Sequence, residues 1–362
     1  MRKLLVLAAA AAVAMSSCSN DGNAPGTSVT SGKALSFSTF VEKTTRGQNA
    51  VLSTKYPVNG QFLTMAYNTG TNALSAASPY SFNYMRGVVT YDGSGYNYYP
   101  THYWPETDKI SFFAVHPADN NILKYTTPTT LSTTALPTQG LPVVGFTVNK
   151  DPLAQADLMM ASAVDQTLTG SAGTVSFAFS HQLTRIGFMA KLKEDYGSKG
   201  DYIRIDSIVV SNVADSASFS FGNTGAITQS APAIKNRKSF TLQSLSNMKN
   251  SGYVSSTTAD SVNLKNSYLL MIPADYSSVT GTAPQTKPAT ITVTYDVECA
   301  DGTKATHTIT KLLSDFTALT GGGNIWSAGQ AINYTMTISL TAVTFTAGVV
   351  DWTTPITTAA LN

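Results

Sequence analysis

The sequence predicts an all-β protein, and three observations support that prediction. Short runs of alternating apolar and polar residues recur along the chain, and Gly, Pro, Asn or Asp closes each of them. Charged residues make up only 12% of the chain, whereas Thr, Ser, Gly, Ala and Tyr are abundant, which suits strands with hydroxyl-rich outer faces. No long stretch has the periodicity of a helix.

The expected strands follow one another from residue 35 to residue 350. They are short and rich in β-branched or aromatic side chains. In chain order they are 35–41, 61–67, 87–91, 110–116, 175–179, 186–192, 202–210, 268–272, 291–297, 332–340 and 343–350. Proline-bearing, hydroxyl-rich stretches such as 125–139 separate them, and we expect these stretches to be surface loops.

Residues 1–17 have the features of an export leader. Arg2 and Lys3 supply a positive start, and residues 4–14 form an unbroken apolar run. The run is about half of the roughly 20 residues that a membrane-spanning helix needs, so we expect a cleaved signal peptide. Cys18 stands where a bacterial leader places the cysteine that becomes lipid-modified, and we predict a palmitate-bearing lipoprotein anchored there. A plain secretory leader cut near Ala14 is the alternative.

The rest of the chain divides into a tether and two expected domains. Residues 18–34 contain almost nothing that a core would bury, so the sequence predicts a solvated tether. About 340 residues follow the leader, more than one hydrophobic core usually holds. We expect two β-sandwich domains, residues 35–181 and 182–362, because one series of strands ends and another begins there.

Charge and cysteine content exclude some classes of protein. Removal of the leader takes away two of the 23 basic residues and none of the 21 acidic ones, which leaves 21 of each. A chain without net charge has no broad field that attracts nucleic acid, so no nucleic-acid partner is expected. If Cys18 is acylated, Cys299 has no partner for an intrachain disulfide.

The sequence offers no catalytic motif. It has no Gly-x-Ser-x-Gly elbow, no phosphate-binding loop and no His-Glu-x-x-His pair, and its four histidines are scattered. We therefore expect no enzyme activity, no cofactor and no metal site. Paired carboxylates of a glycoside hydrolase leave no such signature, so that one class stays open.

Two groups of aromatic residues have a structural and a binding interpretation. We expect the aromatic residues at 102–104 to form a corner of the core. Tyr91, Tyr96, Tyr98 and Tyr99 are expected to pack on a sheet from a hairpin, with stacking on sugar rings as the alternative. His181 is expected to be hydrogen-bonded between the domains.

Several segments, taken in order, resemble the fimbrillin-like proteins of the Bacteroidales, which are subunits of type V pili. The segments are LSFSTFVEKTTRG (35–47), HYWPETDKISFFAVHP (102–117), ADLMMAS (156–162), VSFAFSHQLTRIGFMAKL (175–192), WSAGQAINYTMTISL (326–340) and VVDW (349–352), behind the leader with its cysteine. The resemblance implies two tandem transthyretin-like β-sandwich domains, export as a lipoprotein, and assembly into a surface fibre or its tip.

The resemblance also implies activation by proteolysis. In the family, an arginine-specific protease is thought to cut after an arginine that follows the first strand, and Arg46 is the matching position, with Gly47 as the new amino terminus. Leu35, Phe37 and Thr39 would face inward from the displaced strand. Its removal would leave a groove and a row of unpaired backbone groups, which recruits a replacement strand.

A carboxy-terminal segment of a neighbouring subunit is the expected replacement, and Val343, Phe345, Val349 and Ile356 are its candidate side chains. The expected function is therefore that of a stalk or tip subunit of an adhesive fimbria at the cell outer membrane. Expected partners are other pilus subunits, the membrane through the lipid, an arginine-specific protease, and a host protein or glycan. A glycan-binding lipoprotein of a nutrient-uptake system and a non-polymerising adhesin are the alternatives.

Overall fold

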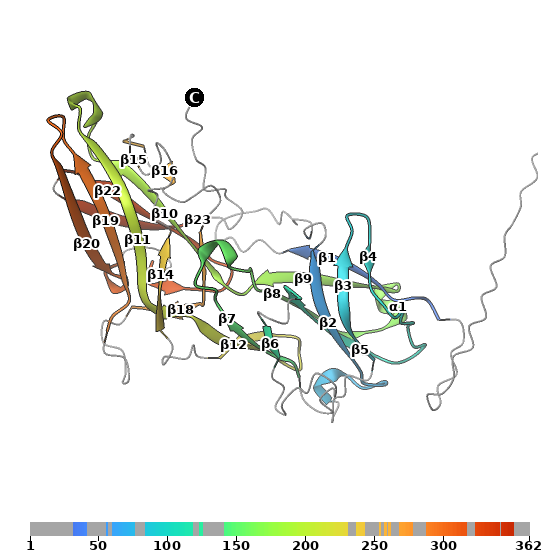
Figure 1. The fold of residues 1–362 in the computed structure, drawn as a ribbon. Coiled ribbons are helices and arrows are strands. Elements are labelled where there is room, and N and C mark those ends of the chain that lie inside the picture. The colour runs from blue at the N-terminus through green and yellow to red at the C-terminus, as the bar shows by residue number, and fades with distance from the viewer. Residues whose placement is uncertain are drawn as a thin grey trace, which may run out of the picture. The chain divides into compact units, whose positions relative to one another are not determined.

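The computed structural model describes residues 32–41, 56, 60–76, 84–118, 123–125, 141–230, 237–242, 253–254, 257–258, 260–261, 268–277, 287–316, 323–340 and 342–350. Strands dominate these residues, which confirms the all-β prediction (Figure 1). The described residues from Lys33 onward form one compact unit. Among the described residues, no helix has the length and apolarity that crossing a bilayer requires. The division into two tandem transthyretin-like domains stays a prediction.

The strands form four larger sheets and one small one. The first sheet has the order β1-β9-β8-β5-β2-β3-β4 and the second the order β13-β12-β7-β6. The third has the order β16-β10-β22-β23, with β17 also on β10, and the fourth the order β14-β11-β19-β20, with β15 also on β11. Strands β18 and β21 make a separate pair.

The bounds of these elements are as follows. The strands are β1 (Ser36–Val41), β2 (Gln61–Asn68), β3 (Met85–Tyr91), β4 (Tyr96–Asn97), β5 (Ile110–His116), β6 (Leu123–Tyr125), β7 (Val143–Thr147), β8 (Met159–Gln166), β9 (Thr174–His181), β10 (Thr184–Leu192), β11 (Tyr202–Ala214), β12 (Ser216–Phe221), β13 (Ile227–Gln229), β14 (Arg237–Leu242), β15 (Tyr253–Val254), β16 (Asp260–Ser261), β17 (Leu269–Met271), β18 (Ala274–Asp275), β19 (Thr290–Glu298), β20 (Lys304–Leu312), β21 (Ile325–Trp326), β22 (Ala331–Ile338) and β23 (Val343–Val350). The helical turns are α1 (Leu168–Ser171) and 3₁₀ segments at Leu74–Ala76, Pro152–Ala154, Gly197–Lys199 and Leu313–Asp315.

The first sheet folds over on itself. Strands β1 and β2 are four steps apart in it, which would separate them by about 19 Å if the sheet were flat. The rings of Phe37 on β1 and Phe62 on β2 nevertheless lie 6.1 Å apart between centroids. The turn occurs between β8 and β9, which pair only through Met159 with His181 and Met160 with Ser180. Strands β1 and β9 therefore cover one face of β2 and β5, and they enclose a first core there.

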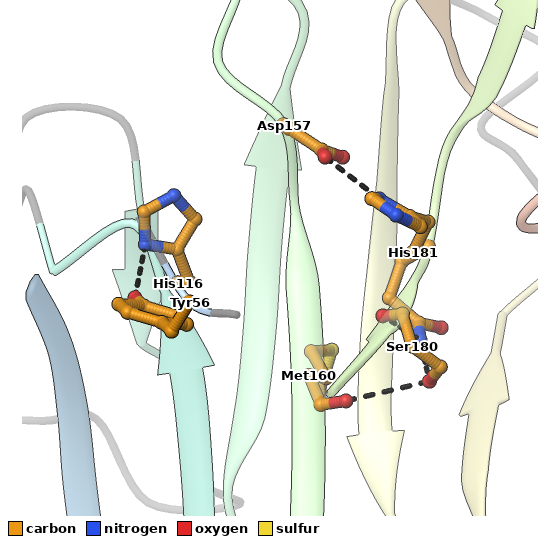
Figure 2. A network of polar contacts seen from close by, with 7 residues as sticks. Tyr56, His116, Asp157, Met160, Ser180 and His181 are labelled. Carbon is orange, nitrogen blue, oxygen red and sulfur yellow. Dashed lines mark hydrogen bonds and ion pairs between the residues drawn. The ribbon is translucent and has the colours of Figure 1, made fainter. Parts of the chain in front are cut away.

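Polar contacts hold this turn of the sheet. Figure 2 shows the Asp157 carboxylate pointing at the His181 imidazole, with Oδ2 and Nδ1 2.7 Å apart. The Ser180 hydroxyl donates to the Met160 carbonyl at 3.3 Å. The Tyr56 hydroxyl meets Nδ1 of His116 in the same view. His181 is thus hydrogen-bonded, as predicted, where the sheet changes direction, and its position between two domains stays a prediction.

A second, larger core takes up the opposite face of β2 and β5. It contains Leu63, Met65 and Phe113 from that face together with apolar residues of the second, third and fourth sheets. The rings of Phe113 on β5 and Phe221 on β12 lie 4.9 Å apart. Strand β12 pairs with β7 from Ser216 with Thr147 to Ser220 with Val143. The predicted boundary between residues 181 and 182 stays a prediction, and this pairing runs across it.

A carboxylate is buried on the otherwise hydroxyl-rich outer face of the fourth sheet. The side chain of Asp296 is 5% exposed and contacts Arg204 at 2.8 Å and Lys304 at 3.0 Å. Thr306 also donates to it at 2.7 Å. Burial acts to raise the pKa of Asp296, but the hydrogen bonds from Thr306, Lys304 and Arg204 prevail and lower it to about 2.

Candidate functional site around the first strand

Strand β1 lies within the first sheet, at its edge, and pairs with one neighbour. It runs parallel to β9, from Ser36 beside Thr174 to Val41 beside Phe179. Leu35, Phe37 and Val41 are buried, while Thr39 is half-buried and its hydroxyl hydrogen-bonds that of Tyr96 at 2.5 Å. This alternation follows from the two-residue period of a strand. It puts one row of side chains into the first core and the other on the outer face.

The ring of Phe37 fills a socket made by four other rings. Its centroid lies 6.1 Å from that of Phe62, 5.4 Å from Tyr98, 6.3 Å from Phe112 and 5.8 Å from Phe177. Three of these contacts are edge-to-face and the fourth is stacked, which are the favourable arrangements for aromatic pairs. The socket is therefore shaped to one aromatic side chain, and it would be empty without β1.

The start of β1 is clasped by backbone hydrogen bonds. The amide of Leu35 donates to the carbonyl of His102 at 2.9 Å, and the amide of Trp104 donates to that of Lys33 at 3.0 Å. The carbonyl of Gly173 accepts from the amide of Ser36 at 3.2 Å and from Nε1 of Trp104 at 3.0 Å. These contacts fix where the strand enters the sheet.

Gly173 is suited to this position for two reasons. Its φ of +85° is a conformation that other residues rarely adopt. A Cβ at this position would lie 2.5 Å from Cδ of Lys33, whose ammonium group donates to the carbonyl of Ala172. The Lys33 side chain thus packs directly over the glycine.

The end of β1 and residue 56 meet at one aromatic ring. Val41 pairs with Phe179, and the ring centroid of Tyr56 lies 5.3 Å from that of Phe179. Tyr56 is 1% exposed, and its hydroxyl donates to the carbonyl of Gln61 at 2.9 Å. The chain between these anchors, residues 42–55, lies outside the described residues and contains Arg46 and Gly47. Both of its ends are therefore held in the first core.

Apolar and aromatic side chains form the first core around β1. Burial raises the pKa of Tyr56 and, to a smaller extent, that of Tyr98, whereas it lowers the pKa of His116. The phenols and the imidazole are thus neutral at physiological pH. The groove that β1 occupies beside β9 can therefore accept an apolar strand, which would form hydrogen bonds with the β9 backbone.

Strand β23, the predicted donor, lies at the edge of the third sheet. It pairs antiparallel with β22 from Val343 with Ile338 to Val350 with Ala331. Val343 and Ala347 are buried, Phe345 packs 6.1 Å from Phe316, and Val349 is 38% exposed. The strand contains neither a charged residue nor a proline. Ile356 and Cys18 lie outside the described residues.

The structure brings Leu35, Phe37 and Thr39 together in one site and places Val343, Phe345 and Val349 in another strand. Sequence reasoning missed Tyr56 and Gly173, and it expected Tyr98 to pack on a sheet without assigning it to this site. Gly173 gave a local signal of a turn, because it lies in a short stretch of small and polar residues, 169–174, directly before the expected strand 175–179. The contacts of the two tyrosines depend on the folding-over of the sheet, which has no local signature.

The aromatic residues at 91–104 divide into buried and exposed groups. Trp104 is 3% exposed, as expected of a core corner, and Tyr91, Tyr96 and Tyr98 are half-buried against the first core. Tyr99 is 90% exposed, so for this residue the expected packing on the sheet is wrong, and Tyr103 is 50% exposed, so its expected place in the core corner is wrong too. The chain bends at residues 99–100, and Tyr103 pairs with Ala34 in an isolated bridge, so its side chain and that of Trp104 point to opposite sides of the extended backbone.

Comparison with known proteins gives concordant results. The sequence model of a family described as fimbrillin-like matches residues 51–352. A fimbrium subunit of Phocaeicola vulgatus, Fim1C, is 28% identical over 172 residues, which are 45% of this chain and 44% of that protein, so the match spans less than half of the relative. The crystal structure of a fimbrial protein from Bacteroides vulgatus shares the fold, with a TM-score of 0.64 and 20% identity over 88% of this chain and 99% of that one.

Proposed function

The chain belongs to the fimbrillin-like family, and on that premise we propose that it is a subunit of a surface pilus that assembles by strand exchange. The observation that carries this proposal is that β1 fills a preformed aromatic socket at a sheet edge and pairs through its backbone with β9. A strand held in this way is replaceable by any strand of similar pattern. The groove left behind would expose apolar sockets and unpaired β9 backbone groups, which favours capture of another strand.

Cleavage after Arg46 would separate β1 from the domain without disturbing its anchors. Arg46 lies between Val41 and Tyr56, both of which are buried beside Phe179. After the cut, β1 would keep only its non-covalent contacts, and Tyr56 would still hold the segment beginning at Gly47. An arginine-specific protease is the partner that this step requires.

The donor that we propose is β23 of a second subunit. Residues 342–349 read AVTFTAGV, and residues 34–41 read ALSFSTFV. Aligned in this way, Phe345 takes the place of Phe37, Val343 that of Leu35, and Val349 that of Val41. The residues between them are small or hydroxylated in both segments except for Phe40. A chain that carries both groove and matching strand joins head to tail, which produces an open filament and favours a stalk subunit.

The edges of the two carboxy-terminal sheets support this choice of donor. Strand β20, at the edge of the fourth sheet, carries Lys304 and Lys311 near its two ends. Lysines protect a sheet edge against pairing with another chain. Strand β23 has no such protection, and it contributes only Val343 and Ala347 as fully buried side chains. The departure of β23 therefore destabilises its own sheet less than the loss of a central strand would.

Export and anchoring complete the proposal. The leader would direct the chain to the cell surface, where lipid on Cys18 would hold the uncut subunit in the outer membrane. After cleavage at Arg46, departure of the fragment that carries both Cys18 and β1 would release the subunit from its lipid and open the groove together, because both precede the cut.

The protease step is tested on purified chain that begins at residue 19. We expect an arginine-specific protease to convert the wild-type monomer into a ladder of detergent-resistant multimers. Arg46→Lys keeps the charge and is the matched control, because it should resist that protease and still assemble after trypsin cleavage. Complete cutting after Arg46 without any multimer would refute the proposal.

The donor register is tested by disulfide trapping in a Cys299→Ser background. The Ser38 and Ser176 hydroxyls lie 2.6 Å apart across β1 and β9, so Ser38→Cys with Ser176→Cys should cross-link the uncut monomer. If Thr346 takes the place of Ser38, then Thr346→Cys in one subunit should cross-link to Ser176→Cys in another after cleavage. Thr344→Cys is the out-of-register control. Equal trapping from both threonine positions, or from neither, would overturn the register.

A further inference from the structure

The loop between β4 and β5 combines tight anchoring with exposed aromatic rings. The side chains of Tyr98 and Trp104 face the first core, and the hydroxyl of Tyr98 donates to the carbonyl of Leu35 at 2.8 Å. Further hydrogen bonds join Leu35 and Lys33 to His102 and Trp104. A segment with this many fixed points cannot move to bury its remaining side chains.

Two of those remaining side chains are among the most exposed apolar groups of the protein. Six large apolar residues of the described part of the chain are strongly exposed, and Tyr99 and Tyr103 are two of them, at 90% and 50%. The backbone of Tyr99 lies next to Gly87, and the carbonyl of Tyr103 accepts from the hydroxyl of Tyr84 at 2.8 Å. The backbone of Tyr99 therefore lies beside β3, and the backbone of Tyr103 is held by the residue that precedes β3.

The chain segment that carries the two rings is uncharged. Residues 95–105 read GYNYYPTHYWP and contain no acidic residue, lysine or arginine. Burial lowers the pKa of His102, which lies between the rings of Tyr84 and Tyr98, so this imidazole also stays neutral. Glu106 follows the run, and the carboxylate of Asp92 before it is taken up by its own turn, where it accepts from Ser94, Gly95 and Asn97.

We propose that Tyr99 and Tyr103 form a binding site for neutral carbohydrate. An exposed phenol offers an apolar face for the C–H face of a sugar and a hydroxyl for its rim. Two tyrosine rings cover at most about 300–500 Å², well below the roughly 800 Å² that each partner contributes to a typical protein interface, so a small ligand fits better. Because residues 95–105 contain no lysine or arginine that would pair with an anionic group, this segment favours neutral sugars over sialylated or sulfated ones. This site is separate from the strand-exchange groove.

The proposal is tested with the intact, uncut chain on an array of immobilised oligosaccharides. The array carries neutral glycans ending in galactose, glucose, mannose or N-acetylgalactosamine, and sialylated and sulfated forms of the same glycans. We expect saturable binding to at least one neutral glycan and about tenfold or greater loss of affinity in Tyr99→Ala/Tyr103→Ala. Tyr99→Phe/Tyr103→Phe should retain a substantial part of the affinity, because the stacking faces remain.

Tyr202 supplies the matched control. It is 53% exposed on the fourth sheet, so Tyr202→Ala removes a comparable exposed ring and should leave glycan binding unchanged. The proposal is overturned if no neutral glycan binds, if only anionic glycans bind, or if the Tyr99/Tyr103 double alanine variant binds as the wild type does. It is also overturned if Tyr202→Ala weakens binding as much as the double variant.

Discussion

Replacement of Phe37 by alanine tests the central structural argument, which is that one side chain of β1 supplies most of its hold on the domain. Phe37 is 6% exposed, and burial of such a ring contributes about 2–3 kcal/mol through the hydrophobic effect. The four surrounding rings belong to three strands and the loop after β4 and cannot collapse fully into the space, so a cavity cost is added. We expect a total of about 4 kcal/mol, within the range for buried Phe→Ala changes.

The measurement has two parts. In the uncut chain, hydrogen exchange of the β1 and β9 amides in increasing denaturant should report the loss of stability. In chain cut after Arg46, the labelled fragment that carries β1 should dissociate with a constant raised by about a hundredfold to a thousandfold. Phe40 is the matched control, because it lies on the same strand, is half-buried on the other face, and should cost about 1 kcal/mol on conversion to alanine. If Phe37→Ala and Phe40→Ala have equal effects in both assays, the socket does not hold β1.

Three further predictions follow from contacts described above. Gly173→Ala should destabilise the first sheet, because alanine is strained at a φ of +85° and the added Cβ displaces the end of the Lys33 side chain. Gly302→Ala has a similar φ of +83° with no atom within 4 Å, so it measures the strain alone, and the excess loss of melting temperature in Gly173→Ala, which should be small, reports the Lys33 contact. The pKa of Asp296, about 2, lies below its value in the unfolded chain, so the ionised carboxylate contributes fully to the free energy of unfolding above about pH 4, and this contribution disappears as the pH falls to about 2. The melting temperatures of wild type and Asp296→Asn should therefore converge between about pH 4 and about pH 2. Tyr56→Phe removes the donor to the Gln61 carbonyl and should cost about 1–2 kcal/mol of unfolding free energy, without preventing cleavage after Arg46.

Local pattern was sufficient to predict many strands but not their partners. Residues 110–116 and 343–350 alternate or run apolar between clear turn signals, and both are strands with those bounds. Strand β20 was missed because its sequence, KATHTITKL, has few apolar residues, as suits an exposed edge. Strand β8, MMASAVDQ, was missed because its small and sulfur-bearing residues have little β preference and gain their place through pairing with β5.

The site shows the same division between local and long-range information. The inward row of Leu35 and Phe37 follows from the period of a strand. The socket around Phe37 does not, because Phe62, Phe112 and Phe177 are brought to it by the fold of a seven-stranded sheet. Parallel pairing of β1 with β9 joins residues 138 apart in the chain, and no periodicity within either strand specifies such a partner.

The late position of β12 in the chain has a consequence for biogenesis. Strand β7 ends at Thr147, but its neighbour β12 is complete only at Phe221, after β10 and β11 have been made. At a ribosomal rate of roughly 5 to 20 residues per second, the nascent chain would carry the unpaired flank of β7, including Val144 and Phe146, for several seconds. A chaperone that holds the emerging chain would therefore find an apolar client surface there, and nonsense truncation between these strands should yield an insoluble product.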